Sequence, residues 1–174
     1  LEVAIRVDVS QNCANTSGFP LLSPRQKLTA APNALNADRL DGLDVSELIF
    51  VTGHLKEQVE SYARARYKIP SRFIEQKVQD GTAGAVNLAR PFVKEPVLII
   101  FVDTVFEADL TLINRSEADG IIWAKEVEDY QRFGVVVTDA DGFMTKIVEK
   151  PSTPVSKLAN IGLYYIRDVQ ALWA

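Results

Sequence analysis

VLIIFVD, residues 97–103, is the stretch that decides the fold. Six apolar residues in a row are typical of a strand covered on both faces, at the centre of an α/β sheet. Ligands of open α/β sheets bind beyond the carboxyl ends of such strands. Asp103 ends the run, and a carboxylate there is a natural ligand for Mg²⁺, which also binds substrate phosphates. The alternative is a helix cap or a loop aspartate in solvent.

Strand and helix patterns alternate on either side of this run. The apolar residues predict strands over residues 48–51, 72–76, 97–102, 120–125, 133–138, 143–148 and 161–166. Helical spacing or a helix start predicts helices over residues 55–63, 80–91 and 109–115, and from Asp168 onward. The turn at residues 139–142 is a hairpin signal. We therefore expect an α/β fold, with a Rossmann-like, mostly parallel sheet flanked by helices and an antiparallel hairpin excursion.

Composition excludes several classes of protein. The chain has 174 residues, 47% hydrophobic and 24% charged, which suits one globular domain and argues against wholesale disorder. It has no apolar run of about 18 residues and no secretory signal pattern, although the first residue is not Met. The single Cys13 allows no internal disulfide, so a cytoplasmic setting is expected. A net charge of −4 does not favour binding to nucleic acid or to an anionic membrane.

Gln76 and Gly81-Thr82 form the second candidate site. A glutamine amide can both donate to and accept from a nucleobase edge. A glycine before a helix lets a ligand approach the backbone, and the helix start offers free N–H groups. The alternative is an ordinary turn with a threonine cap.

A third group lies around the hairpin and the last strand. Lys150 is a mobile point charge suited to phosphate, and Glu149 can accept hydrogen bonds from sugar hydroxyls. Gly134 leaves room for a ligand at the start of a strand, and Asn160 offers an amide before another. The alternatives are an exposed ion pair at a strand end and a structural glycine.

The order of these signals resembles the sugar-phosphate nucleotidyltransferases, or sugar-nucleotide pyrophosphorylases. The resemblance runs from about Asp38 to Trp173, through LIFVTGHLKEQVESY, QKVQDGTAGAV, VLIIFVDTVFEADL, AKEVEDYQRFGVVVTDADGF, IVEKPSTP and LANIGLYYI. It implies transfer of a nucleotidyl group from an NTP to a sugar 1-phosphate, giving an NDP-sugar and pyrophosphate. It also implies Mg²⁺ dependence and no covalent intermediate.

The resemblance assigns a role to each candidate residue. Nucleotide binding falls to Gln76, Gly81 and Thr82, metal binding to Asp103, and sugar-phosphate binding to Gly134, Glu149, Lys150 and Asn160. Asp103 and Lys150 are then the catalytic residues. The expected partners are an NTP and a sugar 1-phosphate, with no nucleic acid and no membrane. The base, the sugar and the oligomeric state, including a homo-oligomer, are left open.

The chain departs from the family pattern in three places. Val102 stands where the family usually has glycine. The strand-like residues 3–9 are not followed by the glycine-rich G-x-G-T-R-L-x-P loop, and residues 10–37 read as an aberrant or poorly structured segment. Third, the chain stops at Ala174, before the part in which family members usually supply another metal-binding aspartate. We therefore expect one nucleotidyltransferase-like domain over residues 1–174 that is incomplete at its C-terminus.

Two other functions stay open. A non-catalytic sugar-nucleotide-binding or regulatory domain of the same fold would suit a chain without the basic loop. A metal-dependent glycosyltransferase usually has a D-x-D-like pair of aspartates after the central strand. In this chain, Val105 stands where the second aspartate would be.

Overall fold

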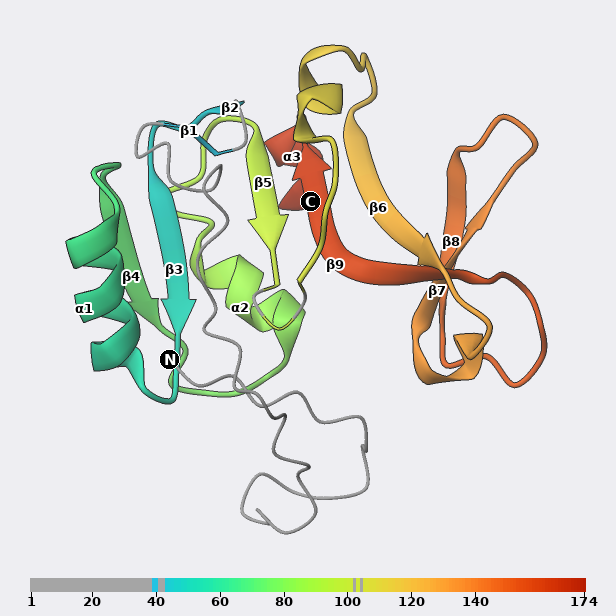
Figure 1. Cartoon of the computed structure of the whole chain (residues 1–174), viewed down its shortest axis with the longest axis horizontal. Helices are drawn as coiled ribbons and strands as arrows, with labels where there is room; N and C mark the ends of the chain where they lie inside the picture. The colour runs from blue at the N-terminus through green and yellow to red at the C-terminus, as the bar shows by residue number, and fades with distance from the viewer. Residues whose placement is uncertain (1–38, 41–42, 102, 104) are drawn as a thin grey trace, which may run out of the picture. The chain divides into compact units, whose positions relative to one another are not determined.

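A computed structural model describes residues 39–40, 43–101, 103 and 105–174 (Figure 1). The chain divides into Leu1–Asn36 and Ala37–Ala174, and the described residues all belong to the second unit. Three predictions therefore lie outside the described residues: the strand-like residues 3–9, the aberrant segment 10–37 and the side chain of Val102. No helix in the described ranges is both long and apolar enough to cross a bilayer.

A parallel strand pair and its crossover helix open the α/β part of the fold. β3 (Leu48–Thr52) and β4 (Ser71–Glu75) pair in parallel along their whole length. Parallel neighbours need a crossover connection, and α1 (Lys56–Arg66) supplies it. Of its residues, α1 buries Ala63. This unit confirms the two strands and the helix that the sequence predicts here.

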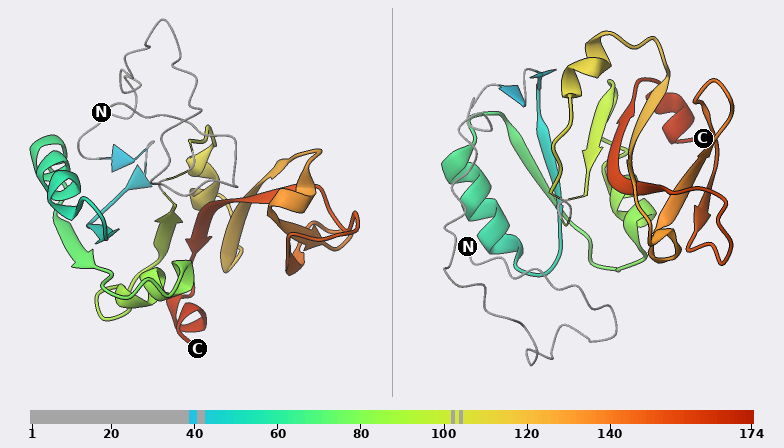
Figure 2. Two further views of the ribbon diagram at one scale, coloured as in Figure 1. Left: turned by 90° about the horizontal axis from the view of Figure 1, so that it is seen from below. Right: turned by 45° about the vertical axis from the view of Figure 1, so that its right-hand side comes forward.

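Two short helices, α2 (Thr82–Leu88) and α3 (Val169–Leu172), lie on the same side of the next strand, β5 (Val97–Ile100) (Figure 2, left). The segment after α2 and the start of α3 share a small core, whose buried members are Ala89, Val93 and Val169. Ile49 of β3 and Val97 of β5 pack against it. This core therefore connects the parallel pair to β5.

The longest described strand, β9 (Leu158–Ile166), organises the five-stranded sheet. β6 (Gly120–Glu126) runs antiparallel along one of its edges. On the other edge, residues 163–166 pair with β5, and residues 158–159 pair with β7 (Gly134–Thr138). The partner of β9 therefore changes between these two stretches, and the strand bends in this region in Figure 1.

Gly162 lies where β9 changes partner. Its φ of +73° favours glycine, and a Cβ there would lie 2.8 Å from the Cβ of Phe101. The Phe101 N–H donates to the Gly162 carbonyl oxygen at 2.8 Å. The register between β6 and β9 also shifts here, between Ile122 and Ala124. A local irregularity thus sets the direction of the segment that carries Asn160.

The predicted hairpin is confirmed as β7 and β8 (Met144–Glu149), which pair antiparallel. The Asp139 carboxylate closes the turn by accepting from the N–H groups of Asp141 and Phe143, at 3.1 and 2.8 Å. The α/β class is confirmed as well. Among the described strands, however, β3 and β4 form the parallel pair, and the five-stranded sheet is antiparallel throughout, because β9 pairs with β5, β6 and β7.

The main core lies on the face of the five-stranded sheet that carries Leu163. Its buried members are Leu43, Leu110, Ile113 and Leu163, from β2 (Leu43–Asp44), η2 (Leu110–Asn114) and β9. β2 pairs antiparallel with β1 (Arg39–Leu40). Trp123 of β6 packs against this core.

We expect Leu163→Ala to lower the free energy of unfolding by about 2–5 kcal/mol, because Leu163 has no exposed surface and its removal leaves a cavity. Leu112→Ala is the matched control, since Leu112 is 40% exposed, and its expected cost is within about 0.5 kcal/mol. Urea unfolding of both variants measures the difference. Equal losses in the two would contradict this assignment of the core.

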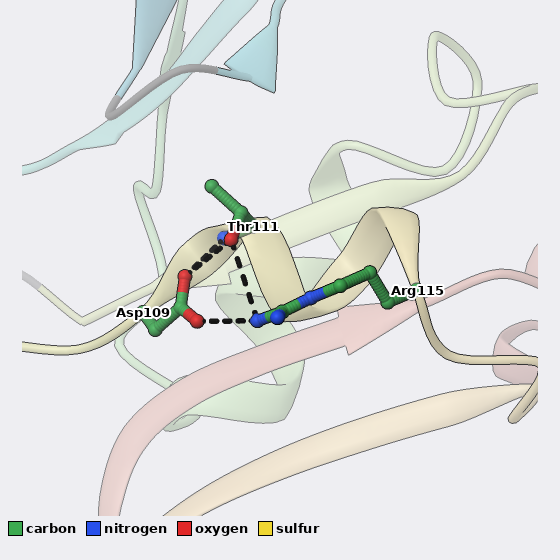
Figure 3. Close-up of polar contacts among 3 residues, drawn as sticks. All are labelled: Asp109, Thr111 and Arg115. Atoms are coloured by element: carbon green, nitrogen blue, oxygen red, sulfur yellow. Dashed lines mark hydrogen bonds and ion pairs between the residues drawn. The ribbon is translucent and has the colours of Figure 1, made fainter.

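An aspartate-capped 3-10 helix, η2, confirms the short helix predicted at residues 109–115. Figure 3 shows the cap: Asp109 Oδ1 accepts from the Thr111 N–H at 3.0 Å and the Thr111 hydroxyl at 2.5 Å. Arg115 Nη2 donates to Asp109 Oδ2 at 2.5 Å. The hydrogen bond from the Thr111 hydroxyl, with smaller contributions from the Thr111 N–H and Arg115, lowers the pKa of Asp109 below its usual value.

This lowered pKa predicts a pH dependence of stability. A carboxyl whose pKa is lower in the folded state stabilises the fold above its unfolded pKa, about 4, and loses that contribution as the pH falls through the folded pKa. We expect Asp109→Asn to reduce the acid-induced fall in melting temperature below about pH 4. Thermal unfolding of the parent and variant from neutral pH to about pH 2 tests this. Parallel curves over that range would refute it.

Candidate functional site

The three residues predicted to bind the nucleotide lie between the end of β4 and the first residue of α2. The Gln76 N–H donates to the Thr52 carbonyl oxygen at 2.8 Å, which ties the loop to the end of β3. Gln76 Nε2 donates to Asp80 Oδ1 at 2.9 Å and to the Gly81 carbonyl oxygen at 3.0 Å. Gly81 has a φ of +95°, and Thr82 begins α2. The structure thus brings Gln76 into contact with Gly81, directly before Thr82 at the start of α2.

An ion pair fixes the end of β4 where this loop begins. Lys56 Nζ of α1 donates to Glu75 Oε2 at 2.7 Å. This hydrogen bond raises the pKa of Lys56 and lowers the pKa of Glu75, and the attraction between the charges adds to both shifts. Since both side chains are partly exposed, the pair contributes little to the stability of the fold.

The residues predicted to bind the sugar phosphate gather around the start of β7. Gly134 and Glu149 are register partners across the hairpin, and a Cβ on Gly134 would lie 2.9 Å from Glu149 Oε2. Lys150 Nζ lies 3.6 Å from Glu149 Oε1, and both side chains are exposed. The glycine therefore leaves room for the Glu149 carboxylate to lie close to the backbone of β7.

Lys150 has an uncommon backbone conformation. Its φ is +42°, in the left-handed region that side chains with a Cβ rarely adopt. The Lys150 N–H donates to the Phe133 carbonyl oxygen at 3.0 Å, just after η3 (Tyr130–Arg132). Non-glycine residues held in this way cluster at ligand sites. The conformation supports a role for Lys150 beyond an ordinary strand end.

Asn160 joins this group through β9. β7 and β9 pair at Val135 and Ala159, so the next step of the antiparallel register brings Gly134 and Asn160 alongside each other. Asn160 Nδ2 donates to the Tyr164 hydroxyl at 2.5 Å, and Asn160 Oδ1 accepts from the Gly162 N–H at 3.1 Å. The amide is therefore oriented, and one N–H of Nδ2 is left for a ligand.

Asp103 is exposed, in a turn beyond β5. The residue lies past the carboxyl end of a strand, as the sequence predicts. The strand differs from the expectation, however: β5 is half-buried and pairs with β9 alone among the described strands, so it is not a fully covered strand at the centre of the sheet. In the described part of the chain, no group of three His, Cys, Asp or Glu side chains could hold a metal ion. Any metal held by Asp103 would therefore take most of its ligands from phosphates and water, which is usual for Mg²⁺.

A hollow of about 380 Å³ lies between α2, α3, β5 and β9. Thr82 lines it at one place, and Phe101 and Tyr164 line it at another, with 5.6 Å between their ring centroids. Of the predicted site residues, Thr82 alone lines this hollow. The hollow nevertheless adjoins both the residues predicted to bind the nucleotide and those predicted to bind the sugar phosphate. Thr82 follows Gly81, and the Tyr164 hydroxyl accepts a hydrogen bond from Asn160.

Sequence reasoning missed two residues that orient the candidate side chains: Asp80 accepts from Gln76, and Tyr164 accepts from Asn160. Tyr164 lies four residues after Asn160, a spacing that says nothing in a regular strand. The two side chains are in contact because Gly162, which lies between them, interrupts the strand.

A family model described as nucleotidyl transferase matches residues 34–170. The chain belongs to the nucleotidyl transferase family. The match covers all the predicted site residues, and it confirms the resemblance to sugar-phosphate nucleotidyltransferases that the motifs indicate.

Two relatives of known sequence agree with this family match, and a solved structure shares the fold. Bifunctional protein GlmU of Methanococcus aeolicus is 34% identical over 127 residues, which are 73% of this chain and 30% of that protein. UTP–glucose-1-phosphate uridylyltransferase AglF of Haloferax volcanii is 30% identical over 134 residues, covering 73% of this chain and 55% of AglF. The structure of HddC from Yersinia pseudotuberculosis shares the fold, with a TM-score of 0.59 at 23% identity over 73% of this chain and 57% of HddC. The chain thus spans 30% to 57% of the length of these proteins.

Proposed function

We propose that this chain carries the site of a sugar-phosphate nucleotidyltransferase, which transfers a nucleotidyl group from an NTP to a sugar 1-phosphate. The observation that carries the proposal is the grouping of Gly134, Glu149, Lys150 and Asn160 where β7, β8 and β9 meet. The family match covers all three strands. The printed name of AglF gives UTP and glucose 1-phosphate as that protein's substrates, which belong to the same classes.

The reaction exchanges one phosphoanhydride bond for another. An oxygen of the sugar phosphate forms a bond to the α-phosphorus of the NTP. The bond from that phosphorus to the oxygen bridging to the β-phosphorus breaks, and pyrophosphate leaves with the electron pair. Such a transfer depends on positioning and charge neutralisation and needs no covalent intermediate.

The sugar-phosphate side of the site uses the residues of the hairpin and β9. In this proposal Lys150 binds the sugar phosphate, because its exposed ammonium is a mobile point charge. Glu149 accepts from sugar hydroxyls, with its carboxylate lying close to Gly134. Asn160 donates its remaining N–H to the sugar.

The nucleotide side uses the loop before α2. Gln76 and Gly81 contact the base, Thr82 lies beside the nucleotide, and Asp103 binds the metal that accompanies the phosphates. A single exposed carboxylate suits Mg²⁺, which usually keeps waters and phosphate oxygens as its other ligands. When bound, Mg²⁺ neutralises phosphate charge.

Product analysis tests the proposal. The 174-residue chain is incubated with each combination of an NTP and a sugar 1-phosphate, with and without Mg²⁺, and both NDP-sugar and pyrophosphate are measured. We expect equal amounts of the two products, formed only when both substrates and the metal are present. Pyrophosphate released without a sugar 1-phosphate, or orthophosphate in its place, would contradict the proposal.

We expect this turnover to be slow, because residues 10–18 lack the basic, glycine-rich loop that the family uses to hold the triphosphate. This sequence observation favours a second candidate function, a domain that binds a sugar nucleotide without turnover. Stabilisation by an NDP-sugar with no product from any substrate pair would identify that function. Rapid turnover would refute the expected role of the missing loop.

A further inference from the structure

The side-chain amide of Gln76 is fixed in one orientation. Its Nε2 lies 2.9 Å from Asp80 Oδ1 and 3.0 Å from the Gly81 carbonyl oxygen. A carboxylate and a carbonyl oxygen can only accept hydrogen bonds, so the NH₂ end of the amide must face them. Both N–H groups of Gln76 are then used within the loop, and the side-chain oxygen, Oε1, is left for a ligand.

Gly84 provides the space that Asp80 occupies. A Cβ on Gly84 would lie 1.8 Å from Asp80 Oδ1 and 2.2 Å from Asp80 Cγ. The carboxylate therefore lies against the first turns of α2, in a place that only a glycine leaves free. Glycine inside a helix is less favourable than alanine by about 1 kcal/mol. The space that the Asp80 carboxylate occupies is therefore a physical reason for glycine at position 84.

We propose that Asp80 is a specificity-determining residue, which holds Gln76 so that it presents an acceptor to the nucleobase. This inference rests on the proposed function, which puts the base at Gln76 and Gly81. A ring nitrogen that faces Gln76 must then carry a proton. Lactam bases such as uracil, thymine, guanine and hypoxanthine have that N–H, whereas the corresponding nitrogen of cytosine and adenine is an acceptor.

The Gly81 backbone supports the same choice. Its carbonyl oxygen is used by the Gln76 amide and by the Ala85 N–H, but in the described hydrogen bonds its own N–H donates to nothing. A lactam places a carbonyl acceptor beside its ring N–H. The free N–H of Gly81 and the free oxygen of Gln76 therefore offer one donor and one acceptor to that pair of groups.

Two matched nucleotide pairs test the role of Asp80. UTP and CTP, and ITP and ATP, differ in the lactam or amidine edge and have the same ring size, so their affinities are measured by calorimetry with Mg²⁺. We expect the parent chain to bind the lactam member of each pair at least about tenfold more tightly, the value of roughly one hydrogen bond. Asp80→Asn should lower this ratio severalfold, because an asparagine amide can donate to Gln76 and allow its amide to flip, while the Gly81 N–H still favours the lactam.

Gly84→Ala provides an independent test. The new methyl group displaces the Asp80 carboxylate, so this variant should lose selectivity as Asp80→Asn does, while alanine favours the helix and preserves folding. Gln79→Ala, in the same loop, is the control and should keep the parent ratio. A purely structural role for Asp80 would change stability and leave the ratio unaltered.

The outcomes separate this inference from the proposed function. Equal binding of both members of a pair by the parent, or an unchanged ratio in both Asp80→Asn and Gly84→Ala, would overturn the role of Asp80 while nucleotide binding remains. If no nucleoside triphosphate binds at all, the proposed function fails, and the inference fails with it.

Discussion

Asp103→Asn is expected to weaken Mg²⁺-dependent binding of the nucleoside triphosphate by about 10- to 100-fold. Asparagine keeps the size of the side chain but removes the negative charge, and one charge-assisted interaction is worth about 1.5–3 kcal/mol. Because Asp103 is exposed, the variant should unfold at the same temperature as the parent. Calorimetric titration at several Mg²⁺ concentrations measures the effect.

Asp141→Asn is the matched control for this variant. Asp141 is also an exposed aspartate, but it lies in the turn between β7 and β8. Its substitution should leave both the nucleotide affinity and the Mg²⁺ dependence unchanged. If Asp103→Asn keeps the affinity and the Mg²⁺ dependence of the parent, Asp103 is not the metal ligand.

Lys150→Met is expected to have a comparable effect on the sugar phosphate. Methionine keeps much of the length of the side chain and removes the ammonium, so binding of the sugar 1-phosphate should weaken by about 10- to 100-fold. Binding of the NTP should not change. The loss of the ion pair with Glu149 should have little effect on folding, because Glu149 is 71% exposed. Separate titrations of the two substrates distinguish these effects.

Lys146→Met provides the control, since Lys146 is an exposed lysine on the same strand, β8. It should bind both substrates as the parent does. A uniform loss of affinity in Lys146→Met and Lys150→Met would show that general positive charge, and not the position of Lys150, attracts the phosphate.

Local patterns predicted most elements because neighbouring residues form them. The strand–helix–strand unit from β3 to β4 follows from apolar residues at strand and helix spacing. The hairpin follows from the turn at residues 139–142, and η2 from its aspartate cap. In each case the contacts that define the element lie close in sequence, so the period of the residues carries the information.

The part of the fold that depends on distant pairing could not be predicted in this way. β9 begins at Leu158, earlier than its apolar run, because β6 and β7 pair with that first segment. The antiparallel character of β5 likewise arises from its pairing with β9, sixty-odd residues later. No local pattern around residues 97–102 specifies which strand will lie beside them.

The candidate site shows the same division. The grouping of Gly134 and Glu149 follows from the hairpin turn, which sets the register between the strands. The contact of Gln76 with Asp80 and the space at Gly84 depend on how side chains pack against α2, so composition and spacing gave no sign of them. The link from Asn160 to Tyr164 likewise depends on the bend at Gly162.

Thermal unfolding of the 174-residue chain with a panel of NDP-sugars, nucleoside diphosphates and nucleoside triphosphates, in the presence of Mg²⁺, tests the central claim most directly. We predict a saturable rise in melting temperature with at least one NDP-sugar and a smaller rise with the matching nucleoside diphosphate. Both rises should be smaller in Lys150→Met, because both ligands carry the phosphate that Lys150 binds. A melting temperature that none of these ligands raises would contradict the account.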